Sequence, residues 1–129
     1  MVKRTIIAIV LFCFLISLAT FEVIAVNNII TELEDKTKQL QIEVKQNEDD
    51  VTKVAPKVLE LKQFWDGNEH ALFLMFNHKD LSTITDSLSR LYSYTSNDNF
   101  DDAIAEVNLL KEYSEKNVHI MGFNIQNIL

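Results

Sequence analysis

The sequence has few residues that end helices and few that could cross-link the chain. It contains only one cysteine, one proline and two glycines. A single thiol, Cys13, excludes an intramolecular disulfide. Scarce proline and glycine argue against a fold built from many turns, and the abundant Leu, Glu, Lys, Ile and Gln residues favour helices. We therefore predict an all-α fold that is stable without a disulfide.

Positive charge is also scarce, and its place in the chain is uneven. The formal net charge is -7, and all nineteen acidic residues lie at or after Glu22. Lys3 and Arg4 precede them, which leaves ten of the twelve basic residues for the rest of the chain. An acidic surface repels phosphate backbones, so we expect no nucleic-acid partner. It also repels anionic lipid headgroups, so we expect the acidic domain to stand off a bilayer.

One long apolar run lies near the N-terminus. No charged residue occurs from Thr5 to Phe21, and Val23 to Val26 extend the run past Glu22. A helix over residues 5–26 would be about 33 Å long at about 1.5 Å per residue, close to the hydrocarbon thickness of a bilayer. We predict a transmembrane anchor over residues 5–26 that contacts membrane lipid.

Basic residues on one side of the anchor predict its orientation. Lys3 and Arg4 precede the apolar run, and the next basic residue is Lys36. The positive-inside bias places residues 1–4 in the cytoplasm and residues 27–129 outside the cell membrane. The alternative is a cleaved signal that would release a secreted protein, with a cleavage site at Val23 and Ala25. The run exceeds the usual core of a signal, which favours the anchor.

Periodic apolar residues predict about four helices after the run. The first continues from the anchor as one rod and ends at residues 47–50. In the second, Pro56 either opens the helix or kinks it, and residues 66–68 end it. The first row is Val26, Ile30, Leu33, Thr37, Leu40 and Val44, and the second is Val51, Val54, Val58, Leu61 and Trp65.

Two further rows complete the predicted antiparallel bundle. A turn at residues 96–99 separates them, and Asp101 and Asp102 suit the first turn of the last helix. The apolar tail, residues 118–129, either packs into a groove of the bundle or forms a strip that binds a partner. The third row is Leu74, Asn77, Leu81, Ile84, Leu88 and Leu91, and the fourth is Phe100, Ala103, Ile104, Val107 and Leu110.

Several of these segments together resemble a known bacterial family. An anchor after two basic residues precedes a Trp65 segment, the sequence Phe-Asn-His-Lys-Asp-Leu at residues 76–81, Asp-Asp-Ala-Ile at 101–104, and an Asn-Ile-Leu ending at 127–129. This order resembles the family called domain of unknown function 4363. The resemblance implies a single-anchor helical protein, often encoded beside a multi-pass membrane protein. It implies no activity and no functional residues.

Asn77 and His78 form the candidate polar site. Asn77 takes a core position between Leu74 and Leu81, where a buried amide could fix helix register or bind a partner. His78 beside it could reach a neighbouring helix. The alternative is that both residues cap a helix or interrupt it locally.

Other polar residues do not combine into a recognisable active site. His78, Ser82 and Asp86 share one helical face, but the sequence supplies no oxyanion hole, and we interpret this face as solvated. The three histidines lack the spacing of a helical metal site, and no glycine-centred calcium loop is present. We expect no catalytic residue, metal or cofactor.

The predicted function is that of a non-enzymatic accessory or interaction subunit of a membrane protein. The alternative is an extracytoplasmic bundle that senses a ligand in a cavity between the second and third helices, lined by aromatic residues. Aromatic side chains at helical spacing more often belong to a core. The sequence leaves the oligomeric state open.

Overall fold

The computed structural model describes residues 2–73 and 76–126, with side chains described as far as residue 116. All regular elements in these residues are helices. They are α1 (Val2–Gln46), a 3-10 helix η1 (Val51–Val54), α2 (Ala55–Leu72), α3 (His78–Ser96) and α4 (Phe100–Gln126). The all-helical class and the four α-helices are as predicted.

Helix α1 is a single helix of 45 residues, about 67 Å long at about 1.5 Å per residue. Its two halves have different surroundings: the large apolar side chains up to Ile24 are exposed, apart from the partly buried Val23, whereas the predicted row from Val26 to Val44 is buried. Thr37 is the polar member of that row, and its hydroxyl donates to the backbone oxygen of Leu33 at 2.7 Å. The helix ends at Gln46, next to the predicted turn.

Pro56 opens helix α2. Residues 51–54 form the short 3-10 helix, and Pro56 then occupies the first turn of α2, where a missing backbone N–H costs no hydrogen bond. Of the two predicted alternatives, the structure shows that Pro56 opens the helix and does not kink it.

The predicted break at residues 66–68 is wrong. Helix α2 continues through Gly67 to Leu72, which is fully buried. Gly67 is exposed, and a methyl group added there would meet no atom within 4 Å. Glycine lowers helix stability by only about 1 kcal/mol, and burial of Leu72 one turn later outweighs that cost.

Helix α3 begins later than predicted. Asn77 precedes its first turn in an extended conformation, and the buried row starts at Leu81. Leu74, the first member of the predicted row, lies outside the described residues. The predicted fourth row is buried at Ala103, Val107 and Leu110 and partly buried at Phe100 and Ile104.

Backbone hydrogen-bonding requirements explain the start of α4. The side-chain oxygen of Asn99 accepts from the backbone N–H of Asp102 at 3.2 Å, which caps the helix. The helix then continues to Gln126. The prediction that residues 118–129 pack on the bundle concerns side chains outside the described residues.

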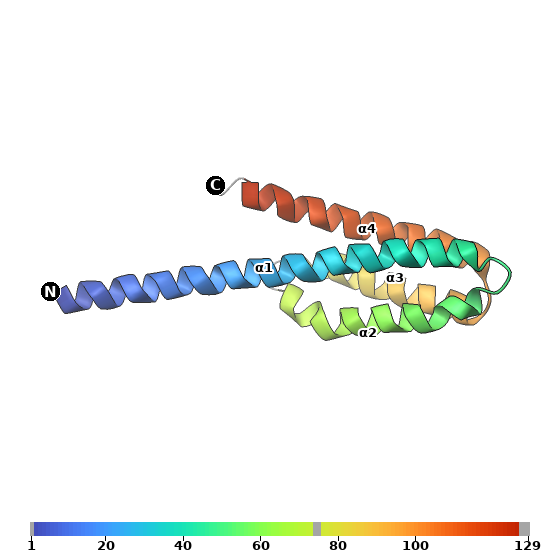
Figure 1. Ribbon diagram of the computed structural model, residues 1–129, viewed down its shortest axis with the longest axis horizontal. Coiled ribbons are helices and arrows are strands. Elements are labelled where there is room, and N and C mark those ends of the chain that lie inside the picture. The colour runs from blue at the N-terminus through green and yellow to red at the C-terminus, as the bar shows by residue number, and fades with distance from the viewer. Residues whose placement is uncertain (1, 74–75, 127–129) are drawn as a thin grey trace.

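The core lies where the second half of α1 meets the other three helices. Helix α1 contacts α2 and α4, and α3 contacts the same two helices. Figure 1 shows that the exposed half of α1 projects from one end of this group. We call this the proximal end; the connection between α2 and α3 lies there, and the other two connections lie at the opposite, distal end.

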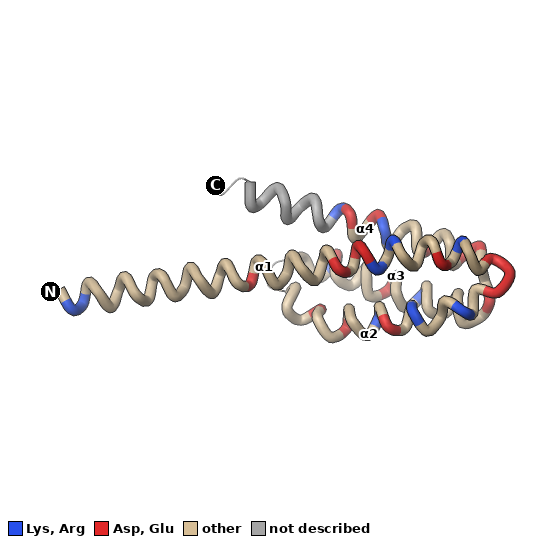
Figure 2. Tube along the Cα trace, in the orientation of Figure 1, with Lys and Arg blue, Asp and Glu red and all other residues tan. Residues whose placement is uncertain are grey.

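The distal connections are acidic and joined to each other. Figure 2 shows acidic residues gathered at this tip; in sequence they include Glu48, Asp49 and Asp50. Asp98, in the second connection, has a positive φ of 53°, a conformation that Asp tolerates better than most residues. Its carboxylate accepts from the backbone N–H of Val51 at 2.9 Å and thereby fixes the two connections together.

Candidate functional site

The first half of α1 is the largest exposed apolar surface in the described chain. An 18-residue window has a mean hydropathy of 2.6, and none of that window is buried. Its polar groups are satisfied locally: the hydroxyl of Ser17 donates to the backbone oxygen of Cys13 at 2.9 Å, and that of Thr20 to Ile16 at 2.8 Å. Among the described residues this is the one helix long and apolar enough to cross a membrane, although a signal sequence would have the same properties.

Asn77 is an exposed helix cap, so its predicted place in the core is wrong. Its side-chain oxygen accepts from the backbone N–H of Lys79 at 3.0 Å. The helical spacing that suggested burial does not apply, because Asn77 itself is not helical and the chain changes direction there. The local alternative, a cap, is what the structure has.

His78 lies in the first turn of α3 and is exposed. Its ring lies 4.6 Å from the ring of Phe73, and His70 contacts the same phenyl ring edge-on at 5.4 Å, measured between ring centroids. These contacts join the end of α2 to the start of α3. A partner contact through His78 stays a prediction.

The face formed by His78, Ser82 and Asp86 is exposed along its length. The hydroxyl of Ser82 donates to the backbone oxygen of Lys79 at 3.0 Å, so its hydrogen is used within the helix. In the part of the chain that was described, no three His, Cys, Asp or Glu side chains come together in a way that could hold a metal ion.

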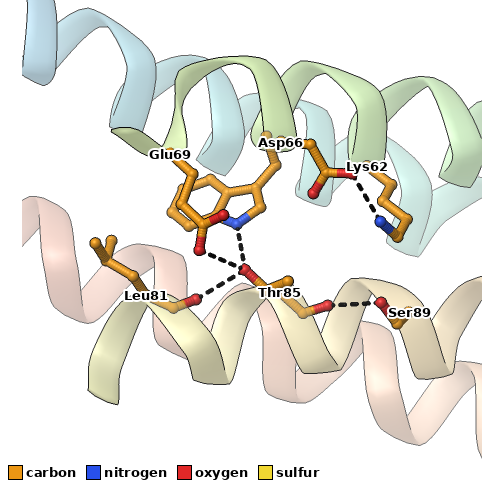
Figure 3. Close-up of polar contacts among 7 residues, drawn as sticks. Lys62, Asp66, Glu69, Leu81, Thr85 and Ser89 are labelled. Atoms are coloured by element: carbon orange, nitrogen blue, oxygen red, sulfur yellow. Dashed lines mark hydrogen bonds and ion pairs between the residues drawn. The ribbon is translucent and has the colours of Figure 1, made fainter. Parts of the chain in front are cut away.

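A buried tryptophan links α2 and α3 through polar groups (Figure 3). Trp65 is fully buried, and its indole N–H donates to the hydroxyl of Thr85 at 2.8 Å. The Thr85 hydroxyl in turn lies 3.0 Å from a carboxylate oxygen of Glu69 and 3.2 Å from the backbone oxygen of Leu81, either of which can accept its hydrogen. The aromatic ring thus belongs to the core, and its one polar atom is satisfied there.

A second polar cluster holds α3 against α4. Glu106 is only 6% exposed. Its carboxylate accepts from the hydroxyl of Ser87 at 2.6 Å and from Arg90 through two bonds of 3.0 and 2.9 Å. The hydrogen bond from Arg90 to the Glu106 carboxylate raises the pKa of the guanidinium above its usual value.

The sequence analysis missed this cluster. Glu106 lies three residues after Ala103 and four before Leu110, so it occupies a core position of the fourth row. A charged residue at such a position indicates a buried ion pair. The sequence does not identify the partner residue, because that residue lies on another helix.

A shallow hollow of about 160 Å³ lies between α1 and α2. Leu40 and Leu61 are apolar members of its lining, and Lys36, Glu43, Lys57 and Glu60 are charged members. Lys57 pairs with Glu43 across the hollow, and Lys36 lies 3.6 Å from Glu60. Its volume is below the roughly 300–1,000 Å³ of typical ligand pockets. The predicted place for a ligand, between α2 and α3, contains the buried Trp65 instead.

Comparison with models of protein families assigns the chain to a family. A family model described as a domain of unknown function, DUF4363, matches residues 20–128. The chain belongs to this family. The DUF4363 match confirms the family suggested by the segments around Trp65 and residues 76–81, and it covers the described helices from the end of the apolar run onwards. Searches of curated proteins and of solved structures gave no match.

Proposed function

We propose that this protein is a non-enzymatic accessory subunit of a membrane protein, tethered by α1 and presenting an antiparallel four-helix bundle outside the cell membrane. The observation that carries the proposal is the division of α1. One uninterrupted helix is bare and apolar as far as Ile24 and packed into the bundle from Val26 onwards. An exposed apolar surface of this length is stable only when lipid or protein covers it. Because α1 is one continuous helix, the bundle is held rigidly to the segment that is covered in this way.

The proposed topology has residues 1–4 in the cytoplasm, residues 5–24 in lipid and residues 27–129 outside, since Val26 of the predicted span is already packed in the bundle. Lys3 and Arg4 support this orientation through the positive-inside bias. The mass of the membrane-extracted protein distinguishes the tether from a cleaved signal. Full mass supports the tether, and a chain that begins near Val26 would overturn it.

The interior polar groups support a structural role rather than a catalytic one. Ser87 and Arg90 both donate to Glu106, and Trp65 donates to Thr85. Among the described residues, every buried side-chain nitrogen and oxygen has a hydrogen-bond partner. Groups that satisfy one another in a folded core stabilise it and are not available to a substrate.

Cross-linking in intact membranes tests the proposal. The tagged full-length protein is cross-linked, extracted in mild detergent and purified. We expect one membrane protein to be recovered reproducibly with it, and recovery of the free monomer alone would count against an accessory subunit. A control variant carries an unrelated apolar helix of equal length in place of residues 5–24. It keeps the partner if the bundle makes the contact and loses it if the anchor does.

A ligand-binding bundle is the second candidate, and the hollow between α1 and α2 is the observation that favours it. The charged side chains around it would suit a small zwitterion better than an apolar ligand. Thermal stabilisation of the full-length protein by a small zwitterion, lost in a Lys57→Gln variant, would support this candidate. We place it second because the hollow is small and its Lys57 and Glu43 side chains already pair with each other.

A further inference from the structure

No linker separates the apolar half of α1 from the bundle. The continuous stretch of exposed apolar side chains in α1 ends at Ile24, with Ile42 exposed singly further on, and Val26 is already only 3% exposed. A helix from Thr5 to Ile24 would be about 30 Å long, about the hydrocarbon thickness of a bilayer. If α1 spans the membrane as proposed above, the proximal end of the bundle therefore reaches the headgroup layer.

The connection between α2 and α3 lies at this proximal end (Figure 1). We define the proximal turn as the described residues 70–73 and 76–79. It contains two phenylalanines that are only partly buried, Phe73 and Phe76, together with the exposed basic or titratable residues His70, His78 and Lys79. None of these residues is acidic.

The composition of the proximal turn is opposite to that of the distal tip. The distal connections carry Glu48, Asp49, Asp50 and Asp98, as expected for turns in water. Phenylalanine rings of interfacial segments bury at the boundary between headgroups and acyl chains, and cationic side chains such as that of Lys79 are attracted to anionic headgroups. The proximal turn itself carries no acidic residue, although Glu69 and Asp80 flank it, so the net charge of the whole chain does not describe this turn.

We infer that the proximal turn lies in the headgroup layer of the leaflet from which α1 emerges and contacts lipid there. The inference rests on the proposed membrane tether. The protein would then touch the bilayer at two places, the anchor and the turn. Two contacts fix the tilt and rotation of the bundle about α1, which a single anchor leaves free, and so fix which faces of α2, α3 and α4 a membrane partner can reach.

Spin-label accessibility in vesicles tests this inference with three full-length proteins. The first is labelled at the native Cys13, in the anchor. The other two carry Cys13→Ser with either Ala71→Cys or Ser96→Cys. Ala71 and Ser96 form a matched pair, because both are small, exposed residues at the C-terminal end of a helix, one proximal and one distal. Each protein is placed in phosphatidylcholine vesicles that contain some phosphatidylglycerol, and collisions with oxygen and with a water-soluble nickel chelate are measured.

We expect the label at Ala71 to collide with the nickel chelate several-fold less, and with oxygen more, than the label at Ser96. Equal chelate accessibility at the two positions, with Cys13 protected, would overturn the inference and leave the tether standing. Chelate access to Cys13 would overturn the tether and the inference together. If protection at Ala71 disappears when lipid is added in large excess, a second copy of the chain covers the turn, and the lipid contact is refuted.

Discussion

The ion pair between Arg90 and Glu106 allows a quantitative test of how α3 is held against α4. The Glu106 side chain is 8% exposed, whereas the Arg90 side chain is 47% exposed. Replacing Arg90 by methionine preserves the aliphatic stem and leaves a buried carboxylate with Ser87 as its remaining donor. Removing one partner of a fully buried pair costs about 3–5 kcal/mol. Because half of Arg90 is in water, solvent can compensate in part, and we expect a loss of about 2 kcal/mol.

The double replacement, Arg90→Met with Glu106→Met, should cost much less than the first replacement alone. It removes both charges, and apolar side chains of similar volume often replace a buried pair at little net cost. We expect the double variant to lie within about 1 kcal/mol of the wild type. The single variant Glu106→Met completes the double-mutant cycle: the sum of the two single losses minus the loss in the double variant gives the coupling energy between the two residues, which we expect to be at least about 1 kcal/mol.

Trp65 provides the assay, because it is the only tryptophan and is fully buried in the bundle. Its emission therefore reports unfolding of the packed helices around it. With a urea slope of about 1–3 kcal/mol/M, a loss of 2 kcal/mol lowers the midpoint by about 1 M. Lys62→Met, which removes a surface pair with Asp66 in α2, is the control and should shift the midpoint by much less.

Two results would refute this reasoning about Arg90 and Glu106. If Arg90→Met behaves like Lys62→Met, the carboxylate of Glu106 does not depend on its cation. If the double variant loses the sum of the two single losses, the residues act independently, and the pairing of α3 with α4 has another cause.

The same titration tests two further positions, and a pH titration tests a third. Gly67→Ala should raise the free energy of unfolding by about 0.5–1 kcal/mol, since Gly67 is an exposed interior position of α2; a loss of stability would contradict its helical placement. Asn77→Ala should cost about 1 kcal/mol while Asn77→Asp costs little, because aspartate can also cap α3; equal costs would exclude the cap. The hydroxyl of Thr52, which donates to Asp50, holds the pKa of that carboxyl below its usual 3.8, so Asp50 stabilises the folded state above that value and loses this contribution as the pH falls through its folded pKa. Thr52→Val should raise the Asp50 pKa towards 3.8 by NMR titration, and an unchanged titration curve would assign the shift to another group.

Local sequence determined the helices and much of the core. Periodic apolar residues are sufficient where one face of a helix is buried along its length, so the row from Val26 to Val44 was predicted residue by residue. The family followed from the same kind of information. The apolar run is likewise a property of composition, which needs no tertiary contact to be recognised.

Only the tertiary structure decided which residues depart from local preference. Gly67 is helical because Leu72, further along α2, is buried in the core. Asn77 caps α3 because the chain changes direction before that helix. Glu106 is buried because Arg90 and Ser87 on another helix meet its carboxylate. The opposite character of the two ends of the bundle also depends on which connections lie together in space. Each of these outcomes depends on residues from different helices, and helical periodicity carries no information about contacts between helices.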